Sequence, residues 1–335
     1  MLTSHTPESW IALRSMPSVD VRAPAEFRRG HIPGAHSIPL FGDETRALIG
    51  TLYKQSGKDA AVRRGVELIA PTMNLLIEQY HAVAPTKEIR LYCARGGMRS
   101  SSIAQMLTLL GFRVHLLQGG YKAYRNFVGE LFTTQYQFKV LSGKTGSGKT
   151  DILHALAKLG EQSVDLEALA CHKGSVFGAL GTAKQPPQQL FENHLAESLL
   201  LCDAARRIWI EDESARIGLC TIPQSIHRQM RAAPVIDLRI EKEQRALLLR
   251  EQYGTFTTGS LIACIKKLEK HIGTERAAEL TAAISASDYR ALDILIDYYD
   301  RQYERGLHRE PRTIIQYEGA HKSFEQIAQE LVEIA

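Results

Sequence analysis

The sequence has no long uninterrupted hydrophobic segment: no apolar run reaches the roughly 18 residues that a membrane helix needs. Its first 20 residues carry acidic groups and lack a basic start followed by an apolar block, so we expect no signal peptide and a cytoplasmic protein. Hydrophobic residues make up 44% of the chain, which excludes a collagenous, low-complexity or wholly disordered polymer. At 335 residues the chain is long enough for two domains.

Cysteine pairs with the spacing of a metal site are also absent. The five cysteines form no CxxC motif and leave one over in any pairing, which argues against a disulfide framework and a simple zinc site. We therefore treat them as free thiols: Cys93, Cys171, Cys202, Cys220 and Cys264. Lys and Arg number 41 against 37 Asp and Glu, a balance of +4 that permits a polyanionic partner without requiring one.

The N-terminal third alternates strands and helices. Apolar patterns predict strands over residues 19–22, 89–92 and 114–117, with helical stretches between them. Gly and Pro in residues 30–40 predict a turn without regular structure. Strands that alternate with helices in this order predict a parallel sheet covered on both faces.

A second α/β pattern begins after residue 135. Strands are expected over residues 138–142, 163–166, 208–210 and 235–240, and the pattern from about residue 243 onward is mostly helical. The fold class predicted is therefore α/β throughout. It comprises a parallel-sheet domain over residues 5–127 and a second α/β domain over residues 135–335 with a helical C-terminal region. We find no internal repeat.

The strongest motif is a complete G-x-x-x-x-G-K-T between a predicted strand and a predicted helix. It predicts a phosphate- or diphosphate-binding P-loop, because its glycines let backbone N–H groups surround phosphate oxygens while the lysine neutralises the anion. The motif does not reveal whether a nucleotide is hydrolysed. Its residues are Gly143, Lys144, Thr145, Gly146, Ser147, Gly148, Lys149 and Thr150.

Acidic residues follow two of the expected strands. Glu211 and Asp212 end an apolar strand in the manner of a Walker B motif, and Asp165, with Glu167, follows the neighbouring strand. These are candidate acid–base or metal-positioning groups, and Thr150 with Asp212 is the candidate Mg²⁺ pair. The alternative is that the acids only cap helices.

A second motif surrounds Cys93 at a predicted strand-to-helix junction. Backbone amides, a helix N-terminus and two arginines would favour the thiolate over the thiol, which makes Cys93 the candidate catalytic thiol. A lone cysteine is more often buried and inert, and the other four lack such surroundings. The proposed anion loop consists of Arg95, Gly96, Gly97, Met98 and Arg99.

The segments DVR, EF, GHIPGA, YCARGGMRSS and QGGYKA resemble a rhodanese domain. The spacing C-x5-R from Cys93 to Arg99 is similar to the phosphatase branch of that fold, whose wider loop suits a tetrahedral anion. With the segments GTLYKQSGKDAA, VLSGKTGSGKT, VDLEALACHKGSVFG and WIEDESARIG, the whole chain resembles the tRNA 2-selenouridine synthase family.

This resemblance implies a transferase that modifies 2-thiouridine at wobble position 34 of tRNA. It would first S-geranylate the base with geranyl diphosphate at the P-loop. It would then replace the geranylated sulfur with selenium from selenophosphate at the cysteine loop. No tightly bound cofactor is expected, Mg²⁺ is a candidate ion, and a selenophosphate-supplying enzyme is a candidate partner. The resemblance leaves open which tRNAs are modified and what the oligomeric state is.

The C-terminal helices carry basic residues interleaved with tyrosines, a pattern that could bind RNA phosphates and stack bases. Arg301 and Arg305 are the candidate tRNA contacts, although neighbouring acids are equally consistent with a solvated helix face. The other basic residues considered are Arg228, Arg231, Arg239, Lys242, Arg245, Arg250, His308, Arg309 and Arg312, with Tyr298, Tyr299 and Tyr303 between them.

Two other functions fit the motifs. One is an ATP-dependent P-loop kinase or ATPase fused to a rhodanese sulfurtransferase, which predicts ATP turnover. The other is an RNA-binding regulator whose cysteine senses redox conditions. An apolar groove for a geranyl chain would have candidates near the P-loop, although these residues are more often plain helix core: Phe177, Leu180, Leu190, Phe191 and Leu195.

Overall fold

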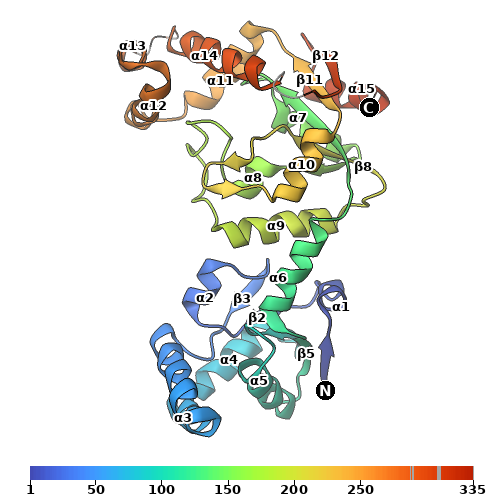
Figure 1. Ribbon diagram of the computed structural model, residues 1–335, viewed down its shortest axis with the longest axis vertical. Coiled ribbons are helices and arrows are strands. Elements are labelled where there is room, and N and C mark those ends of the chain that lie inside the picture. The colour runs from blue at the N-terminus through green and yellow to red at the C-terminus, as the bar shows by residue number, and fades with distance from the viewer. Residues whose placement is uncertain (287, 289, 308–310, 335) are drawn as a thin grey trace. The chain divides into compact units, whose positions relative to one another are not determined.

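The structure is a computed structural model that describes residues 1–286, 288, 290–307 and 311–334 (Figure 1). The chain packs as two compact units. The first contains Met1–Leu131 together with Pro187–Ala196, and the second contains Phe132–Pro186 and Glu197–Ala335. A segment from within the predicted P-loop domain therefore belongs to the first unit. No helix in the described part of the chain is long and apolar enough to cross a membrane.

The first unit is built on a five-stranded sheet in the order β1-β5-β4-β2-β3, with every neighbouring pair parallel. Its elements are β1 (Leu2–His5), α1 (Pro7–Ala12), β2 (Ser18–Asp20), α2 (Pro24–Arg29), β3 (Ala35–Ser37), α3 (Asp43–Ile69), a 3₁₀ turn (Ala70–Thr72), α4 (Met73–Val83), β4 (Glu88–Tyr92), α5 (Met98–Leu109), β5 (Arg113–Leu117) and α6 (Gly120–Leu131).

Strand β4 lies in the middle of this sheet and is buried almost throughout. Its apolar side chains Ile89 and Leu91 join a core cluster with Leu76 and Tyr80 of α4 and with residues of α5. Burial of a strand on both faces is what a parallel sheet between helices requires. The end of β4 is thereby fixed at the point where Cys93 begins the cysteine loop.

The segment between β3 and α4, which has no strand alternation, is the helix α3. It is interrupted at Gly57, whose φ of 85° and ψ of −178° are incompatible with a regular helix. A positive φ is readily adopted only by glycine. The break therefore follows directly from the residue at that position.

The second unit is built on another parallel sheet, in the order β12-β11-β6-β8-β7. Its elements are β6 (Gln137–Gly143), α7 (Lys149–Lys158), β7 (Gln162–Val164), α8 (Leu166–Ala170), α9 (Gln188–Leu200, of which the first residues belong to the first unit), β8 (Arg207–Glu211), β9 (Arg216–Ile217), β10 (Cys220–Thr221), α10 (Gln224–Ala232), β11 (Val235–Arg239), α11 (Lys242–Tyr253), α12 (Thr258–Ile272), α13 (Thr274–Ser285), α14 (Arg290–Leu307), β12 (Ile314–Glu318) and α15 (Phe324–Ile334).

The predicted fold class is confirmed, because both units are α/β with parallel sheets. Three edge or near-edge features were missed. Strands β1 and β12 lie at sheet edges, and β3 forms within the segment for which we expected only a turn. Strands β1 and β3 are short and partly polar, so their pairing depends on the neighbouring strand more than on their own sequence pattern.

Candidate functional site

The P-loop joins the central strand β6 to the helix α7. Gly146 and Gly148 have φ values of +81° and +73°, a region that favours glycine. A Cβ on Gly148 would lie 2.3 Å from the ring of Phe324, so space as well as backbone conformation requires glycine there. The loop therefore has the geometry in which successive backbone N–H groups turn toward an anion at the N-terminus of α7.

The cationic and hydroxyl side chains of the motif lie at the start of α7. Lys149 Nζ donates to the backbone oxygen of Gly143 across 2.9 Å, which holds the ammonium group over the loop. Thr150 Oγ1 donates to Glu211 Oε1 at the end of β8 across 3.1 Å and lies 3.4 Å from Glu167 Oε2. The P-loop and the Walker-B-like strand thus meet through Thr150 and Glu211.

Three carboxyl groups gather beside Thr150. Burial, reinforced by Asp165 and Glu167, raises the pKa of Glu211 to about 8, and burial with Glu167 and Glu211 raises the pKa of Glu213 to about 8. The pKa of Glu167 is raised chiefly by burial as well. Glu211 and Glu213 therefore hold protons near neutral pH, and a bound cation would favour the ionised forms of all three acids.

Asp212 and Asp165 lie in other surroundings. Asp212 accepts a hydrogen bond from Ser142 across 2.7 Å and forms an ion pair with Arg312 across 3.0 Å. Asp165 caps α8 by accepting from the backbone of Ala168 and pairs with His154. The structure does not bring together Thr150 and Asp212, the residues expected to bind Mg²⁺, because the carboxylate that touches Thr150 belongs to Glu211.

The side chains beside Thr150 determine whether this place could bind Mg²⁺. Thr150 and Glu211 offer only oxygen ligands, which are the type that Mg²⁺ prefers. Among the described residues, no group of three or more His, Cys, Asp and Glu side chains is arranged to hold a metal ion. An ion at this place would therefore draw further ligands from substrate oxygens and water, as Mg²⁺ commonly does.

Arg301 and Arg305 of α14 line a cavity of about 500 Å³ together with Lys144 of the P-loop. Other expected RNA contacts have structural partners instead. Arg245 and Arg312 are buried in ion pairs with Asp300 and Asp212. Tyr303 hydrogen-bonds Ser142 and Asp237, and Tyr298 and Tyr299 pack against the helical core, so these rings do not form a stacking platform. His308 and Arg309 lie outside the described residues.

The apolar candidates for a geranyl groove do not form one group. Phe177 and Leu180 pack into the core of the α12–α14 helices in the second unit. Leu190, Phe191 and Leu195 belong to the segment that packs with the first unit. The plain helix-core interpretation holds for Phe177, which is 2% exposed.

In the first unit, Cys93 follows β4 and its side chain is 3% exposed. Ser100 Oγ, at the third position of α5, donates a hydrogen bond to Cys93 Sγ across 3.1 Å. Ser100 is itself buried. The sulfur is thus held between the N-terminus of α5 and a hydroxyl donor.

The cysteine loop is supported by a second turn. Tyr121 N donates to Cys93 O across 2.8 Å, and Lys122 N donates to Ala94 O across 3.0 Å. A Cβ on Gly120 would lie 2.3 Å from Cys93 O, so only glycine allows this approach. The QGG turn before α6 therefore fixes the shape of the loop.

The two arginines of the loop differ. Arg99 pairs with Glu26 of α2, with its NH1 atom 2.7 Å from Glu26 Oε2, and this pairing lowers the pKa of Glu26 against the opposing effect of burial. Arg95 is exposed. Of the expected anion-binding arginines, Arg95 faces solvent, whereas Arg99 already has a carboxylate partner.

Matches to known proteins cover the whole arrangement. The model of the tRNA 2-selenouridine synthase AAA domain matches residues 136–334, and that of the rhodanese-like domain matches residues 9–127. The tRNA 2-selenouridine synthase of Marinobacter nauticus is 34% identical, in an alignment that covers 90% of this chain and 91% of the relative. That of Shewanella denitrificans is 31% identical, with 95% of each chain covered.

This chain belongs to the tRNA 2-selenouridine synthase family. The resemblance predicted from its motifs is confirmed. Among solved structures, the N-terminal domain of a protein described as ATP/GTP binding from Clostridium difficile 630 is 38% identical. It covers 38% of this chain and 98% of that chain, with a TM-score of 0.35.

Sequence reasoning about this family member missed Ser100, Glu26 and Asn193. Ser100 had a readable signal, because it stands in the first turn of the helix that follows Cys93. Glu26 belongs to the segment EF of the rhodanese resemblance, but its pairing with Arg99 had no readable signal, since the two residues come from different helices. Asn193, which is fully buried, donates to His31 O and to Tyr121 OH, and it holds the α9 segment in the first unit.

Proposed function

We propose that the protein is a tRNA-modifying transferase that converts 2-thiouridine at wobble position 34 into 2-selenouridine. The P-loop would bind geranyl diphosphate for S-geranylation of the base, and the Cys93 loop would serve replacement of the geranylated sulfur by selenium from selenophosphate. One chain of this family contains two loops, each between a strand and a helix. The P-loop carries Lys149 and the other loop carries Cys93, and this observation carries the proposal.

The first step forms a bond between the sulfur of the base and C1 of the geranyl group. It breaks the bond from C1 to the diphosphate oxygen, and the N3 proton of the base is released. Negative charge develops on the departing diphosphate. Lys149 and the backbone N–H groups at the start of α7 would stabilise that charge, which is the largest single contribution that a preorganised site can make.

Thr150 and Glu211 are the residues that we propose to hold Mg²⁺ beside the diphosphate. When bound, the ion supplies positive charge to the diphosphate oxygens. Glu211 would then be ionised, because a neighbouring cation opposes the effect of burial on its pKa. No tightly bound cofactor beyond this ion is proposed.

The second step breaks the bond from C2 of the base to the geranylated sulfur and forms a bond from C2 to selenium. Geranyl thiol leaves, and water cleaves the bond between selenium and phosphorus to release phosphate. The net change needs no oxidant or reductant. Prior alkylation explains the order of steps, because it turns a poor leaving group into a better one.

We propose Cys93 as the catalytic thiol of the second step and the amides of the loop as the site for the selenophosphate oxyanion. Ser100 would keep the sulfur oriented. Arg99 is paired with Glu26, whereas Arg95 is exposed to solvent. Arg95 would therefore attract the incoming anion. An enzyme that produces selenophosphate is the class of partner that this step requires.

The test supplies purified protein with thiolated tRNA, geranyl diphosphate, Mg²⁺ and selenophosphate, and it follows the three wobble nucleosides by mass spectrometry. Omission of selenophosphate should stop the reaction at the S-geranylated base. Failure to form either product, with ATP hydrolysed instead, would support the ATPase alternative. Binding of RNA without any change of the nucleoside or turnover of ATP would support the regulator.

A further inference from the structure

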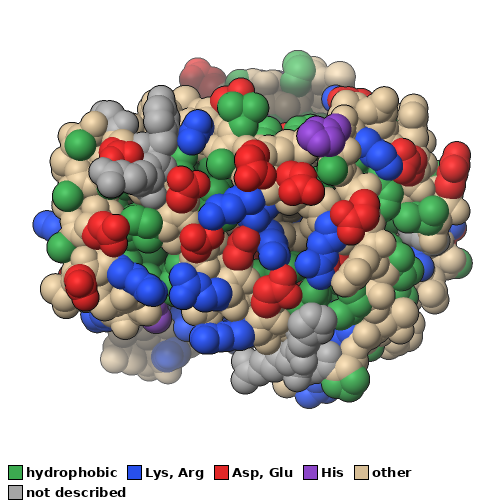
Figure 2. All heavy atoms as spheres, turned by 90° about the horizontal axis from the view of Figure 1, so that it is seen from above, with side chains coloured by type: hydrophobic (Ala, Val, Ile, Leu, Met, Phe, Trp, Pro, Cys, Tyr) green, Lys and Arg blue, Asp and Glu red, His purple; other side chains and the backbone are tan. Residues whose placement is uncertain are grey.

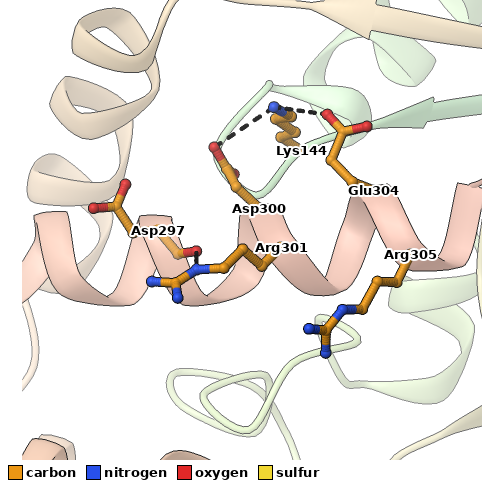
Figure 3. A pocket seen from close by; sticks show the side chains of 6 residues that line it. All are labelled: Lys144, Asp297, Asp300, Arg301, Glu304 and Arg305. Atoms are coloured by element: carbon orange, nitrogen blue, oxygen red, sulfur yellow. Dashed lines mark hydrogen bonds and ion pairs between the residues drawn. The ribbon is translucent and has the colours of Figure 1, made fainter.

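The cavity beside the P-loop is lined mainly by one face of α14 (Figure 3). Its helical residues recur at intervals of three and four, the spacing of a single helix face. They are Asp297, Asp300, Arg301, Glu304 and Arg305. The cavity is a shallow hollow of about 500 Å³ that is widely open to solvent.

Every acid of this cavity has a cationic partner. Asp297 pairs with Lys242 across 2.5 Å, and Asp300 pairs with Arg245 across 2.7 Å. Glu304 pairs with Lys144 across 3.0 Å. The negative charges that line the cavity are therefore neutralised within the protein.

The two arginines of the cavity differ from the acids. Arg301 donates through Nε to the backbone oxygen of Asp297, and neither it nor Arg305 has a carboxylate partner among the described residues. Both side chains are exposed, and they extend from α14 on the side away from Lys144 (Figure 3). Two guanidinium groups are thus available to an anion that enters from solvent.

The cavity is continuous with the P-loop through Lys144. This lysine is the second residue of the motif, and it is held toward α14 by Glu304 and by Asp300, 3.8 Å away. Arg245 reinforces the connection by donating to Thr145 O across 3.1 Å while it pairs with Asp300. An anion held by Arg301 and Arg305 would therefore lie across α14 from Lys144, in the same unit as the diphosphate site.

The surface around the cavity favours an RNA contact at one phosphate over a contact along several phosphates. On the face shown in Figure 2, Lys and Arg side chains are interspersed with Asp and Glu. A polyanion that lay flat on such a surface would meet charges of both signs. Unpaired cations at one cavity instead favour the insertion of a single phosphate group.

We propose that this cavity binds a backbone phosphate of the single-stranded RNA next to the nucleotide that is alkylated, through Arg301 and Arg305. This inference rests on the proposed function for the identity of the RNA. The P-loop amides already serve the diphosphate, so the two arginines supply a second anion site for the other substrate. The base of that nucleotide would then meet the geranyl diphosphate within the second unit.

Binding tests this directly, without turnover. The probe is a fluorescent anticodon stem-loop RNA with uridine at position 34, measured by anisotropy with the full-length protein as salt is varied. The double variant Arg301→Gln/Arg305→Gln should bind about tenfold more weakly, with a log-affinity against log-salt slope reduced by about 0.7 for each phosphate lost. Arg276→Gln, on the exposed face of α13, is the matched control and should bind like the parent.

A second measurement separates the cavity from the diphosphate site. Pyrophosphate with Mg²⁺ should bind the double variant and the parent equally. When formation of the S-geranylated nucleoside is followed, the KM for thiolated tRNA should rise in the double variant while kcat stays similar. Unchanged RNA affinity would overturn the proposal. So would a loss of pyrophosphate affinity alone, which would make the cavity part of the diphosphate site. If no variant transfers a geranyl group, the proposed function fails while the RNA-binding result still decides the cavity.

Discussion

The Ser100 hydroxyl donates a hydrogen bond to the Cys93 sulfur across 3.1 Å, from the first turn of α5 back to the end of β4. Ser101, the next residue, is exposed and donates to Gly97 O, an acceptor that Ser100 Oγ also reaches across 3.2 Å. The two serines thus share one backbone acceptor, but only Ser100 contacts the thiol, so Ser101 serves as a control for Ser100.

Ser100→Ala should slow alkylation of Cys93 by iodoacetamide about tenfold at neutral pH, because the thiolate loses its hydroxyl donor. Ser101→Ala should leave the rate unchanged. Mass spectrometry of the peptide that contains Cys93 gives the rate for that thiol alone. Cys220 serves as an unreactive reference, because burial raises its pKa to about 11. Equal rates in the two variants would remove Ser100 from the site.

Cys93→Ala should separate the two half-reactions. The P-loop step uses no thiol, so the S-geranylated nucleoside should accumulate while 2-selenouridine falls below detection. Cys202→Ala, which removes a thiol whose pKa is raised by burial, should form 2-selenouridine normally. Normal selenium transfer by Cys93→Ala would reduce the first unit to a scaffold.

Lys149→Ala should reduce geranyl transfer between a hundredfold and a thousandfold, a loss of about 3 kcal/mol of transition-state stabilisation on the diphosphate. Lys158→Ala, at the other end of α7 and exposed, is the matched control and should retain the parent rate. Single-turnover kinetics with thiolated tRNA measure both. A parent-like rate in Lys149→Ala would mean that the diphosphate binds elsewhere.

The buried acids predict how stability depends on pH in metal-free buffer. The pKa of Glu213 is about 8 in the folded protein, above its ordinary value of 4.5, so the folded state binds more protons than the unfolded state between these values. Unfolding free energy should therefore fall as pH rises from about 5 to 8.

Glu213→Gln should flatten this dependence and raise the stability at pH 8 by at least about 1 kcal/mol, or roughly 2–4 °C in Tm. Glu251→Gln, an exposed acid on α11, should leave the curve unchanged. Thermal scans in chelator across this pH range provide the measurement. If stability changes with pH equally in Glu213→Gln and in the parent protein, this carboxyl is already ionised when the protein is folded.

Asn193→Ala should destabilise the first unit by about 1–3 kcal/mol, because it leaves buried partners at His31 and Tyr121 without their hydrogen bonds. Asn126→Ala, exposed on α6, should cost much less. Denaturant titration followed by the tryptophans gives the difference. Similar midpoints would show that other contacts hold the α9 segment, such as its apolar packing and the Arg125–Glu192 ion pair.

The P-loop could be placed from the sequence because its residues are contiguous and its chemistry is local. The choice between Glu211 and Asp212 could not be made, because adjacent residues of a strand point to opposite sides and the pattern does not say which side meets Thr150. The basic residues of the C-terminal helices were equally ambiguous. Arg245 is buried against Asp300 whereas Arg301 faces a cavity, a difference that only packing decides.

The segment Pro187–Ala196 is encoded within the second half of the gene but completes the fold of the first unit. A cut between the two matched family regions, at residues 128–135, would therefore not yield two self-sufficient proteins. The fragment 1–131 would expose the surface that Asn193 covers. The remaining fragment would contain the first part of α9 without the surface against which it packs. A rhodanese module from another protein could replace the native one only if it also fitted this segment, so an exchange of the module has to include Pro187–Ala196.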